Sequence, residues 1–553
     1  MTKISIYQLL PRFFGNTDAV RKPWGSIEDN GCGKFEDIND NAIAAIKDLG
    51  ITHIWYTGIL QHATTTDYTR YHINSDNPLI VKGRAGSPYA IKNYFDVDPD
   101  LAINTANRMT EFDNLIKRTH NHNVKAIIDF IPNHVARCYN SIAANKKAQL
   151  QTCNHLGQND NNAVKFDRNN DFYYILNESF KVPDEVRQIT QKIFPDNNSD
   201  YEEFPAKVTG NDCFSASPSV NDWYETVKIN YGTDYQTGEK HFYPIPHSWL
   251  CMYDILKFWC SKNVDGFRCD MAEMVPVEFW QWAISKIKHE FTNIIFIAEI
   301  YQPQLYQGFI EAGFDYLYDK VNMYDCMKSI IQNGASVNNI TQSWQQTNAY
   351  NSYMLRFLEN HDEQRIASKF FAGDPFKAIP AFAVEAFMHS GPIMLYNGQE
   401  LGEQSDEASG FSGSDGRSTI YDYWSFDKQI RWNNSHKFND ENLNNEELAL
   451  RKCYKEILNF AISEELISKG FFYDLMWINQ ELAGLGCYAF AKGNKIKGGK
   501  NKTMVFVVNF TQKHVKTHIN ISKHVIEFFN MNFDDDFFIT IDVDGYGYQH
   551  KNI

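Results

Sequence analysis

The chain has 553 residues, of which 43% are hydrophobic, and it carries a formal net charge of −15 at pH 7. This length exceeds the roughly 250 residues of a bare eight-stranded α/β barrel, so two or three domains are expected. The acidic balance and the lack of long lysine or arginine runs argue against nucleic acid or a membrane surface as a partner. A neutral substrate fits this composition better.

The ten cysteines are irregularly spaced and include no Cys-x-x-Cys pair, which predicts buried free thiols, Cys251 and Cys260 among them. Such thiols suit a reducing compartment. Met1 is followed almost at once by the apolar run 4–9, which leaves no room for a signal peptide. We therefore expect a cytoplasmic protein, or a periplasmic or secreted one if a leader has been removed.

The first elements alternate between strand and helix. Residues 4–9 predict a strand, 105–121 show helical spacing of their apolar residues, and 124–128 predict another buried strand. From about 135 to 228 the pattern gives way to Asn- and Asp-rich stretches with short aromatic patches. A run of about ninety such residues is too long for a loop in a compact domain, so we predict an inserted subdomain.

The alternation resumes beyond this insertion and then changes character near the C-terminus. The predicted elements are a helix at 249–262, buried strands at 264–267, 294–298 and 354–358, and a helix at 446–462. From residue 475 the chain consists of short alternating runs, such as 503–510 and 515–521, separated by Gly, Asn and Asp. This pattern predicts a small antiparallel β domain.

Polar residues stand at the exits of four predicted strands. The four segments are Asp129 to His134 (DFIPNH), Gly266 to Asp270 (GFRCD), Ile297 to Glu299 (IAE) and Phe357 to Asp362 (FLENHD). Ionisable groups at the carboxyl ends of separate parallel strands are how a (β/α)₈ barrel builds an active site. The sequence therefore predicts an enzyme whose carboxylates and histidines meet at one end of a barrel.

In content and order these segments resemble the alpha-amylase family of glycoside hydrolases. The likeness covers nearly the whole chain, since residues 6–13 are similar to the family's first strand and 392–400 to its eighth. The resemblance implies a (β/α)₈ TIM barrel, with a subdomain inserted after strand 3 and a C-terminal antiparallel β-sandwich. It divides the chain into barrel at 1–134 and 229–465, inserted domain at 135–228 and C-terminal domain at 466–553.

The resemblance also implies three catalytic roles, with Asp270 as nucleophile, Glu299 as general acid and base, and Asp362 as stabiliser of the oxocarbenium-like state. Retaining hydrolysis needs one ionised carboxylate and one carboxylic acid. Arg268 stands two residues before Asp270, so both side chains face the same way and the guanidinium would keep that carboxylate ionised. Glu299 follows an apolar run, whose poor solvation suits a protonated acid.

The residues that the resemblance assigns to substrate binding surround these carboxylates. Arg365 lies three residues after Asp362 and would steady the subsite, with a surface salt bridge as the alternative. Asp129 would brace the site from below. The full implied set is Tyr89, Asp129, His134, Arg268, His361 and Arg365.

Two departures from the family pattern concern specificity and metal. Glu273 and Met274 replace a Lys-His pair found in many endo-acting amylases, and this stretch looks more like cyclomaltodextrinases and neopullulanase-like enzymes. In calcium-dependent relatives Asn133 shares Ca²⁺ with an aspartate, whose place here is taken by Ser219. A serine offers no anionic oxygen, so we expect this Ca²⁺ site to be weak and no cofactor to be required.

A carboxylate elsewhere in the insertion, such as Asp212 or Asp222, would restore that Ca²⁺ site. For function, the leading hypothesis is a retaining α-glucoside hydrolase acting on α-1,4 bonds of α-glucans or maltooligosaccharides. The alternatives are a cyclomaltodextrinase-like or transglycosylating enzyme on small oligosaccharides and, more remotely, a non-catalytic carbohydrate-binding protein. Chain-length preference and oligomeric state stay open.

Overall fold

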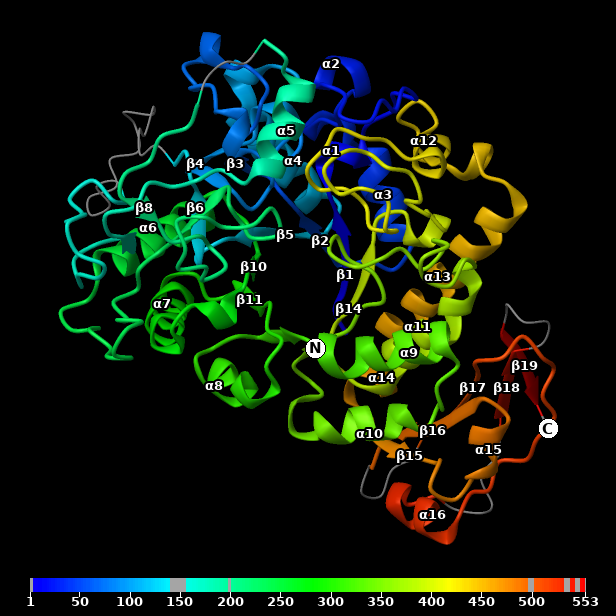
Figure 1. Cartoon of the computed structure of the whole chain (residues 1–553). Coiled ribbons are helices and arrows are strands. Elements are labelled where there is room, and N and C mark those ends of the chain that lie inside the picture. The colour runs from blue at the N-terminus through cyan, green and yellow to red at the C-terminus, as the bar shows by residue number, and fades with distance from the viewer. Residues whose placement is uncertain are drawn as a thin grey trace.

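Eight parallel strands form the centre of the computed structural model (Figure 1), which describes residues 3–139, 156–196, 200–495, 502–531, 538–542 and 548–552. The strands follow the order β13-β12-β11-β10-β5-β2-β1-β14 around the sheet. Their bounds are β1 (Ser5–Leu9), β2 (His53–Tyr56), β5 (Lys125–Phe130), β10 (Gly266–Cys269), β11 (Ile295–Ala298), β12 (Tyr316–Tyr318), β13 (Met354–Leu355) and β14 (Ile393–Tyr396).

The two end strands of this sheet meet through a parallel bridge between Arg356 and Ile393. The main-chain N–H of Met394 also donates to the carbonyl of Arg356 over 2.8 Å. The sheet therefore closes almost completely on itself. The predicted (β/α)₈ barrel is confirmed.

Helices surround the barrel, and some of them begin with a side-chain cap. Helix α13, for example, begins with a capping box in which Asn444 and Glu447 satisfy one another's main-chain N–H groups. The larger helices of this layer are α3 (Asp40–Asp48), α4 (Arg108–Asn121), α6 (His247–Ser261), α7 (Val277–Glu290), α8 (Tyr306–Glu311), α9 (Asp325–Asn333), α10 (Asn339–Gln346), α11 (Ile379–Met388), α12 (Asp427–Asn433) and α13 (Asn445–Ser463).

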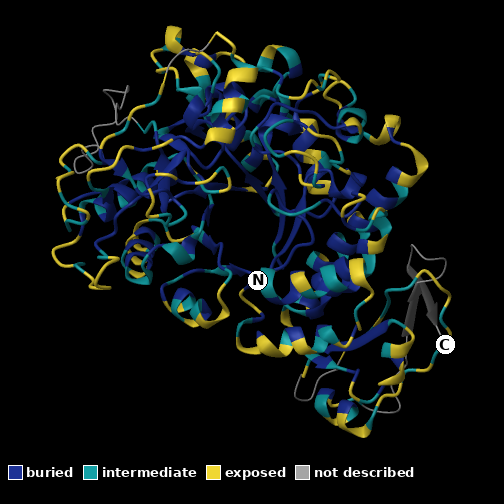
Figure 2. Ribbon diagram, in the orientation of Figure 1, coloured by how far each residue is buried: buried dark blue, intermediate teal, exposed yellow. Residues whose placement is uncertain are grey.

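The apolar core has two layers, because successive strand residues face opposite sides of the sheet. The large outer layer lies between strands and helices, and most residues of the barrel strands are buried in Figure 2. A smaller cluster fills the inside of the barrel and includes Ile6, Trp55, Ile127, Ile297, Tyr318, Leu355, Phe357 and Met394. These inward residues set the direction of the side chains that follow them along each strand.

The insertion after β5 begins and ends at one short antiparallel ladder. Strand β6 (His134–Ala136) pairs with β9 (Thr226–Lys228), so that His134 lies opposite Lys228. Between them are strands β7 (Tyr174–Ile175) and β8 (Ala206–Lys207) and helix α5 (Asp184–Ile193). Residues 140–155 and 197–199 lie outside the described part.

The C-terminal region contains a three-stranded antiparallel sheet of β15 (Phe471–Asp474), β16 (Cys487–Gly493) and β17 (Thr503–Asn509), followed by helix α16 (Lys523–Phe529). Strands β18 (Phe538–Asp542) and β19 (Tyr548–Asn552) form a separate antiparallel pair. The predicted strand at 515–521 is wrong, since this segment is irregular.

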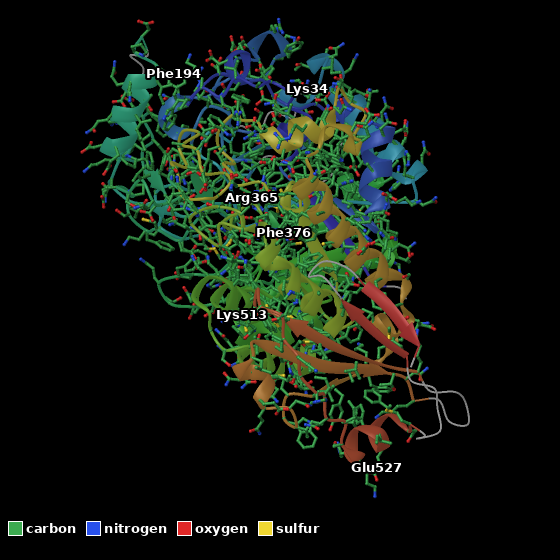
Figure 3. All side chains as sticks on the ribbon, turned by 90° about the vertical axis from the view of Figure 1, so that its right-hand side faces the viewer. Lys34, Phe194, Arg365, Phe376, Lys513 and Glu527 are labelled. Atoms are coloured by element: carbon green, nitrogen blue, oxygen red, sulfur yellow. The ribbon has the colours of Figure 1, made fainter. Side chains whose placement is uncertain are left out.

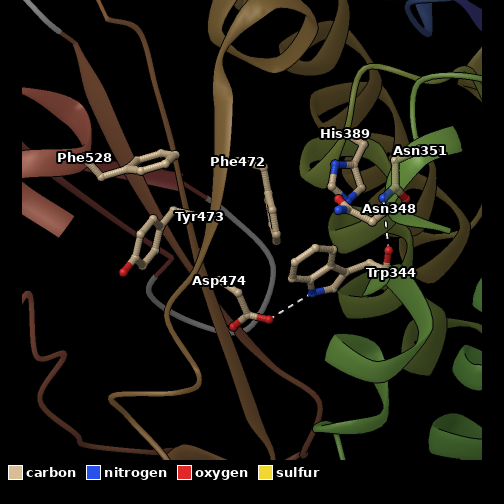
Figure 4. Close-up of a pocket in the computed structure, with 8 residues that line it drawn as sticks. All are labelled: Trp344, Asn348, Asn351, His389, Phe472, Tyr473, Asp474 and Phe528. Carbon is tan, nitrogen blue, oxygen red and sulfur yellow. Dashed lines mark hydrogen bonds between the residues drawn. The ribbon is translucent and has the colours of Figure 1, made fainter. Parts of the chain in front are cut away.

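A pocket of about 420 Å³ lies where this region meets α10 (Figure 4). Aromatic side chains line it, and Asp474 on its wall accepts hydrogen bonds from Thr341, Trp344 and Tyr488. This pocket is remote in the fold from the strand-end carboxylates.

Two sequence expectations concern thiols and membranes. Eight cysteines of the described residues carry free thiols, but Cys251 is disulfide-bonded, so the predicted free thiol at this position is wrong. Within the described part of the chain, no helix has the length and apolar character needed to cross a membrane.

Candidate active site

The inward face of the barrel becomes charged at the carboxyl ends of the strands. Two residues beyond the inward Ile127 comes Asp129, and two beyond the inward Ile297 comes Glu299. On β10, Phe267 and Cys269 belong to the outer core layer, so Arg268 faces inward between them. Because side chains along a strand alternate with a period of two, the predicted groups lie together above the apolar cluster that fills the barrel.

Arg268 lies at the centre of this group and is fully buried. Its Nη1 lies 2.7 Å from Asp270 Oδ1 and 3.7 Å from Asp129 Oδ1, and its Nη2 lies 2.7 Å from Glu299 Oε1. Its Nε donates to Tyr318 Oη over 3.1 Å. One guanidinium thus holds both carboxylates to which the resemblance assigns chemistry.

Asp270 keeps one oxygen uncommitted. Its Oδ1 is bound by Arg268, whereas its buried Oδ2 has no hydrogen-bond partner among the described residues. Burial raises the pKa of this carboxyl above its usual value, and the charge and hydrogen bond of Arg268 oppose that rise. Asp270 therefore has one oxygen held by Arg268 and one whose lone pairs no described residue binds.

Glu299 is held at both oxygens. The main-chain N–H of Met271 donates to Oε2 over 2.6 Å and the Tyr301 hydroxyl donates to Oε1 over 2.7 Å. Burial raises the pKa of Glu299, the Arg268 charge lowers it, and the Asp270 charge raises it. A carboxyl group with a raised pKa can carry a proton near neutral pH.

Two further carboxyl groups share this environment. Asp129 is buried and accepts the Gly58 N–H over 3.1 Å, and burial raises its pKa to about 7. Desolvation by the surrounding residues, and then the negative charge of Glu299, raise the pKa of Asp362 to about 8. The Asp362 side chain is nevertheless 41% exposed, so it sits at an opening rather than in a filled core. Water that reaches this carboxylate screens its charge and weakens the electrostatic part of this upward shift.

His361 and Tyr89 lie together beside Asp362. Tyr89 Oη is 2.6 Å from His361 Nε2, the two rings stack at 5.2 Å, and His361 Nε2 is 3.1 Å from Asp362 Oδ2. Gln8 on β1 donates to His361 Nδ1 over 2.8 Å. Burial, and then the Arg268 charge, lower the pKa of His361 well below its usual value, so the imidazole is neutral.

His134 joins the group from the start of the insertion. Its side chain hydrogen-bonds the main chain of Tyr89, and its ring lies 5.1 Å from that of Trp223. Burial lowers the pKa of His134 to about 3, with the nearby Lys228 charge acting in the same direction. Both predicted histidines are therefore neutral hydrogen-bonding groups.

Arg365 differs from the other predicted binding residues, because it is fully buried in the barrel domain (Figure 3). It bonds to Glu359 over 2.9 Å, to Ser418 over 2.8 Å and to the Asn397 carbonyl, and it stacks over the Tyr396 ring. A surface salt bridge does not fit this buried position, and the role of Arg365 in substrate binding stays a prediction. Arg365 instead supports the segment that carries Asp362.

The surroundings of Asn133 do not fit a calcium ion. The ammonium of Lys228 donates to Asn133 Oδ1 and lies 2.8 Å from Asp212 Oδ1, and Asn133 Nδ2 donates to the Gly210 carbonyl. A cation of this size needs several anionic oxygens, and here a positive charge already lies among the oxygens. Across the described residues, no group of three or more His, Cys, Asp or Glu side chains could hold a metal ion.

Sequence reasoning missed several residues that contact this site, among them Gln8, Tyr301, Tyr318 and Lys228. The position of Tyr301, two residues after Glu299, was an available signal, because alternate residues of an extended segment face one way. Gln8 follows the inward Ile6 by the same rule. Lys228 carried no such signal, since its partner Asn133 is 95 positions away.

Comparison with known proteins gives a match over most of the chain. The model of the alpha-amylase catalytic domain matches residues 8–457. Alpha-amylase 3 from Dictyoglomus thermophilum is 22% identical over 400 residues, which cover 69% of this chain and 63% of that protein. An alpha-1,4-glucan:maltose-1-phosphate maltosyltransferase from Rhodospirillum rubrum is 26% identical over 129 residues, 23% of this chain and 16% of that protein. These matches span less than two thirds of either relative.

Solved structures agree in fold. The alpha-amylase from Geobacillus thermoleovorans, complexed with acarbose, gives a TM-score of 0.57 at 18% identity and covers 92% of this chain and 87% of that one. The cyclic alpha-maltosyl-(1→6)-maltose hydrolase from Arthrobacter globiformis gives 0.56 at 16% identity, with coverages of 89% and 88%. At these identities the likeness concerns the fold.

Proposed function

Because the chain belongs to the alpha-amylase family, we propose that it is a retaining α-glucoside hydrolase that cleaves α-1,4 bonds of α-glucans or maltooligosaccharides. One observation carries this proposal: a single guanidinium, that of Arg268, contacts Asp270 and Glu299 at 2.7 Å each. Double displacement needs a nucleophile and an acid close together on one sugar, and this shared hold keeps them so.

In this proposal, the free Oδ2 of Asp270 attacks the anomeric carbon while Glu299 gives its proton to the departing glycosidic oxygen. A covalent glycosyl-enzyme forms at Asp270. Glu299, now ionised, takes a proton from a water molecule whose oxygen attacks the anomeric carbon; the bond to Asp270 breaks, and the sugar leaves with its original configuration. Asp362, His361 and His134 bind ring hydroxyls, while Tyr89 presents its ring to the apolar sugar face.

The stereochemical course tests this proposal. With a maltooligosaccharide, proton NMR should detect the α-anomer first, before mutarotation, since two displacements at one carbon restore configuration. An initial β-anomer contradicts the mechanism. Absence of turnover on every α-glucan, with the fold intact, would favour the non-catalytic alternative.

A second candidate is an enzyme for small or cyclic maltooligosaccharides, either hydrolytic or transglycosylating. It is favoured by Glu273, whose carboxylate accepts the N–H groups of Tyr301 and Gln302 over 2.9 and 3.0 Å. This side chain ties two loops together, in a place where many endo-acting amylases have a lysine. Incubation with maltoheptaose, soluble starch, β-cyclodextrin and pullulan separates the candidates. Preferential opening of cyclodextrin, or products longer than the substrate, supports the second.

A further inference from the structure

Lys228 is a buried cation at the joint between the insertion and the barrel. It closes strand β9, pairs with His134 in the β6–β9 ladder and is only 2% exposed. Its Nζ is surrounded by Asn133 Oδ1, by Asp212 Oδ1 at 2.8 Å and by the Met274 carbonyl at 3.2 Å.

These three oxygens come from three separate parts of the molecule. Asn133 follows barrel strand β5, Asp212 belongs to the insertion, and Met274 ends the short helix Ala272–Met274 just after Asp270. A single ammonium therefore fastens the insertion to the barrel and to the turn behind Asp270. Divalent ions fasten protein segments in the same manner, through oxygens contributed by each segment.

The charges around the ammonium are already balanced. Asp212 supplies one negative charge, and Asn133 and Met274 supply neutral oxygens. Asp222, the other nearby carboxylate, is occupied by Asn211 Nδ2 at 2.7 Å and by the N–H and hydroxyl of Ser219. A Ca²⁺ ion would have to expel Lys228 and would then find a single free carboxylate.

We propose that Lys228 is the permanent cation of this joint, replacing a divalent metal and positioning the insertion, His134 and the turn after Asp270. The joint is complete without metal. Its effect on the active site rests on the proposed function, whereas its effect on stability and metal response does not.

The path from Lys228 to the active site is short. Asn133 Nδ2 lies 3.1 Å from His134 Nδ1, and His134 in turn bonds the main chain of Tyr89. Without the ammonium, Asn133 Oδ1 and the Met274 carbonyl each lose a buried donor, and the ladder that orients His134 loosens. Lys228 is therefore a positioning residue.

Two substitutions and one control test the proposal. Lys228→Met removes the charge and keeps the stem of the side chain, and Lys228→Asp adds a carboxylate to the oxygens of Asp212, Asn133 and Met274. The control is Lys82→Met, because Lys82 is likewise buried and also joins the insertion, through Glu225 at 3.1 Å and the Asp222 carbonyl at 3.2 Å, but donates to neither Asn133 nor Met274. Melting temperatures are measured with EDTA, Ca²⁺ or Mg²⁺.

For the wild-type chain, EDTA or Ca²⁺ should shift the melting temperature by about 2 °C or less. Lys228→Met should lower it by about 4 °C or more, with no recovery in Ca²⁺. Lys228→Asp should be strongly destabilised in EDTA and should gain about 5 °C or more in Ca²⁺ but not in Mg²⁺, since it completes an oxygen site. Lys82→Met should be insensitive to metal.

The effect on the active site is measured as kcat and KM with maltoheptaose, at a temperature well below the melting temperatures of all variants. Lys228→Met should raise KM more than it lowers kcat, because sugar binding by His134 is disturbed. Lys82→Met should leave kcat/KM unchanged. A Ca²⁺-induced rise of many degrees in the wild-type chain overturns the proposal, as does a Lys228→Met variant with unchanged melting temperature and KM. If Lys228→Asp does not fold even in Ca²⁺, these two measurements decide.

Discussion

Two buried arginines of the barrel have different surroundings, and the contrast shows what distinguishes a reactive cluster from a structural one. Arg268 faces the barrel interior, where Asp129, Asp270 and Glu299 surround one positive charge. Arg356 lies at the bridge between β13 and β14, where it pairs with Asp319 at 3.2 Å and with Asn351.

The two clusters differ in charge balance and in access. Near Arg356, burial lowers the pKa of Lys3 well below its usual value and raises that of Glu385 well above it, so both groups are driven toward their neutral forms and Arg356 and Asp319 are left as a balanced pair. Around Arg268 carboxylates outnumber cations, and Asp362 beside them is 41% exposed. Burial and mutual repulsion raise the pKa values of the carboxyl groups around Arg268, so these groups can exchange protons beside an opening, whereas the balanced pair of Arg356 and Asp319 in a sealed site stabilises the fold.

The largest expected effect is at Asp270. Asp270→Asn should lower kcat by about 10⁴-fold or more, because the covalent step has no substitute nucleophile. Its melting temperature at pH 7 should be unchanged or higher, since the substitution removes a buried charge whose pKa is raised. Substantial residual turnover in a folded, purified variant would disprove the nucleophile assignment.

Glu299→Gln should lower kcat by about 10²- to 10⁴-fold, the usual cost of losing general acid–base catalysis. The loss should be smallest for glucosides with an activated leaving group, which depart without a proton. Comparison of 4-nitrophenyl and maltooligosaccharide substrates measures this difference. Equal losses on both would count against the acid role.

At the structural cluster, Arg356→Met should lower the free energy of unfolding by about 3–5 kcal/mol, because Asp319 is left buried without its cation. The value of kcat, measured well below the melting temperature, should stay that of the wild-type chain. Urea unfolding with parallel kinetics gives both numbers, and Arg356→Lys is the conservative control. A selective loss of kcat would remove the distinction between the two arginines.

The smallest effect concerns Tyr301. Its hydroxyl donates to Glu299 and lowers the pKa of that carboxyl, so Tyr301→Phe should raise this pKa. The acid must be protonated, and activity falls as pH rises through its pKa, so the alkaline limb of the kcat profile should move to higher pH. The rate at the optimum should fall less than about tenfold. An alkaline limb that stays in place, or moves down, would show that Glu299 does not set it.

The sequence predicted the barrel and its carboxylates well, because both depend on local periodicity. The apolar runs before Asp129 and Glu299 alternate inward and outward, and each carboxylate is the next inward position; on β10 the inward positions are Arg268 and then Asp270. Family resemblance, rather than periodicity, supplied the roles of these groups. Those roles remain predictions.

Other features depend on contacts that no local pattern records. Arg365 follows Asp362 by three residues, but only the packing against Glu359 and Tyr396 shows that its side chain is buried away from the opening. The alternation at 515–521 resembles a strand, yet a strand also needs a neighbour with which to pair. Lys228 and its oxygens meet only after the insertion has folded back onto the barrel.

The ladder that closes the insertion has an evolutionary consequence. The chain leaves the barrel at His134 and returns at Lys228, directly opposite. One residue beyond the far end of this ladder, the Arg137 N–H donates to the Glu225 carbonyl over 2.7 Å. The two chain segments that join the insertion to the barrel therefore keep the same positions whatever the length of the insertion. Since lengthening a loop with fixed ends costs only about 0.6 kcal/mol per doubling, residues can be added or removed there with little penalty to the barrel. Substrate preference can therefore diverge between descendants of such a chain by editing one segment, while the catalytic groups keep their places.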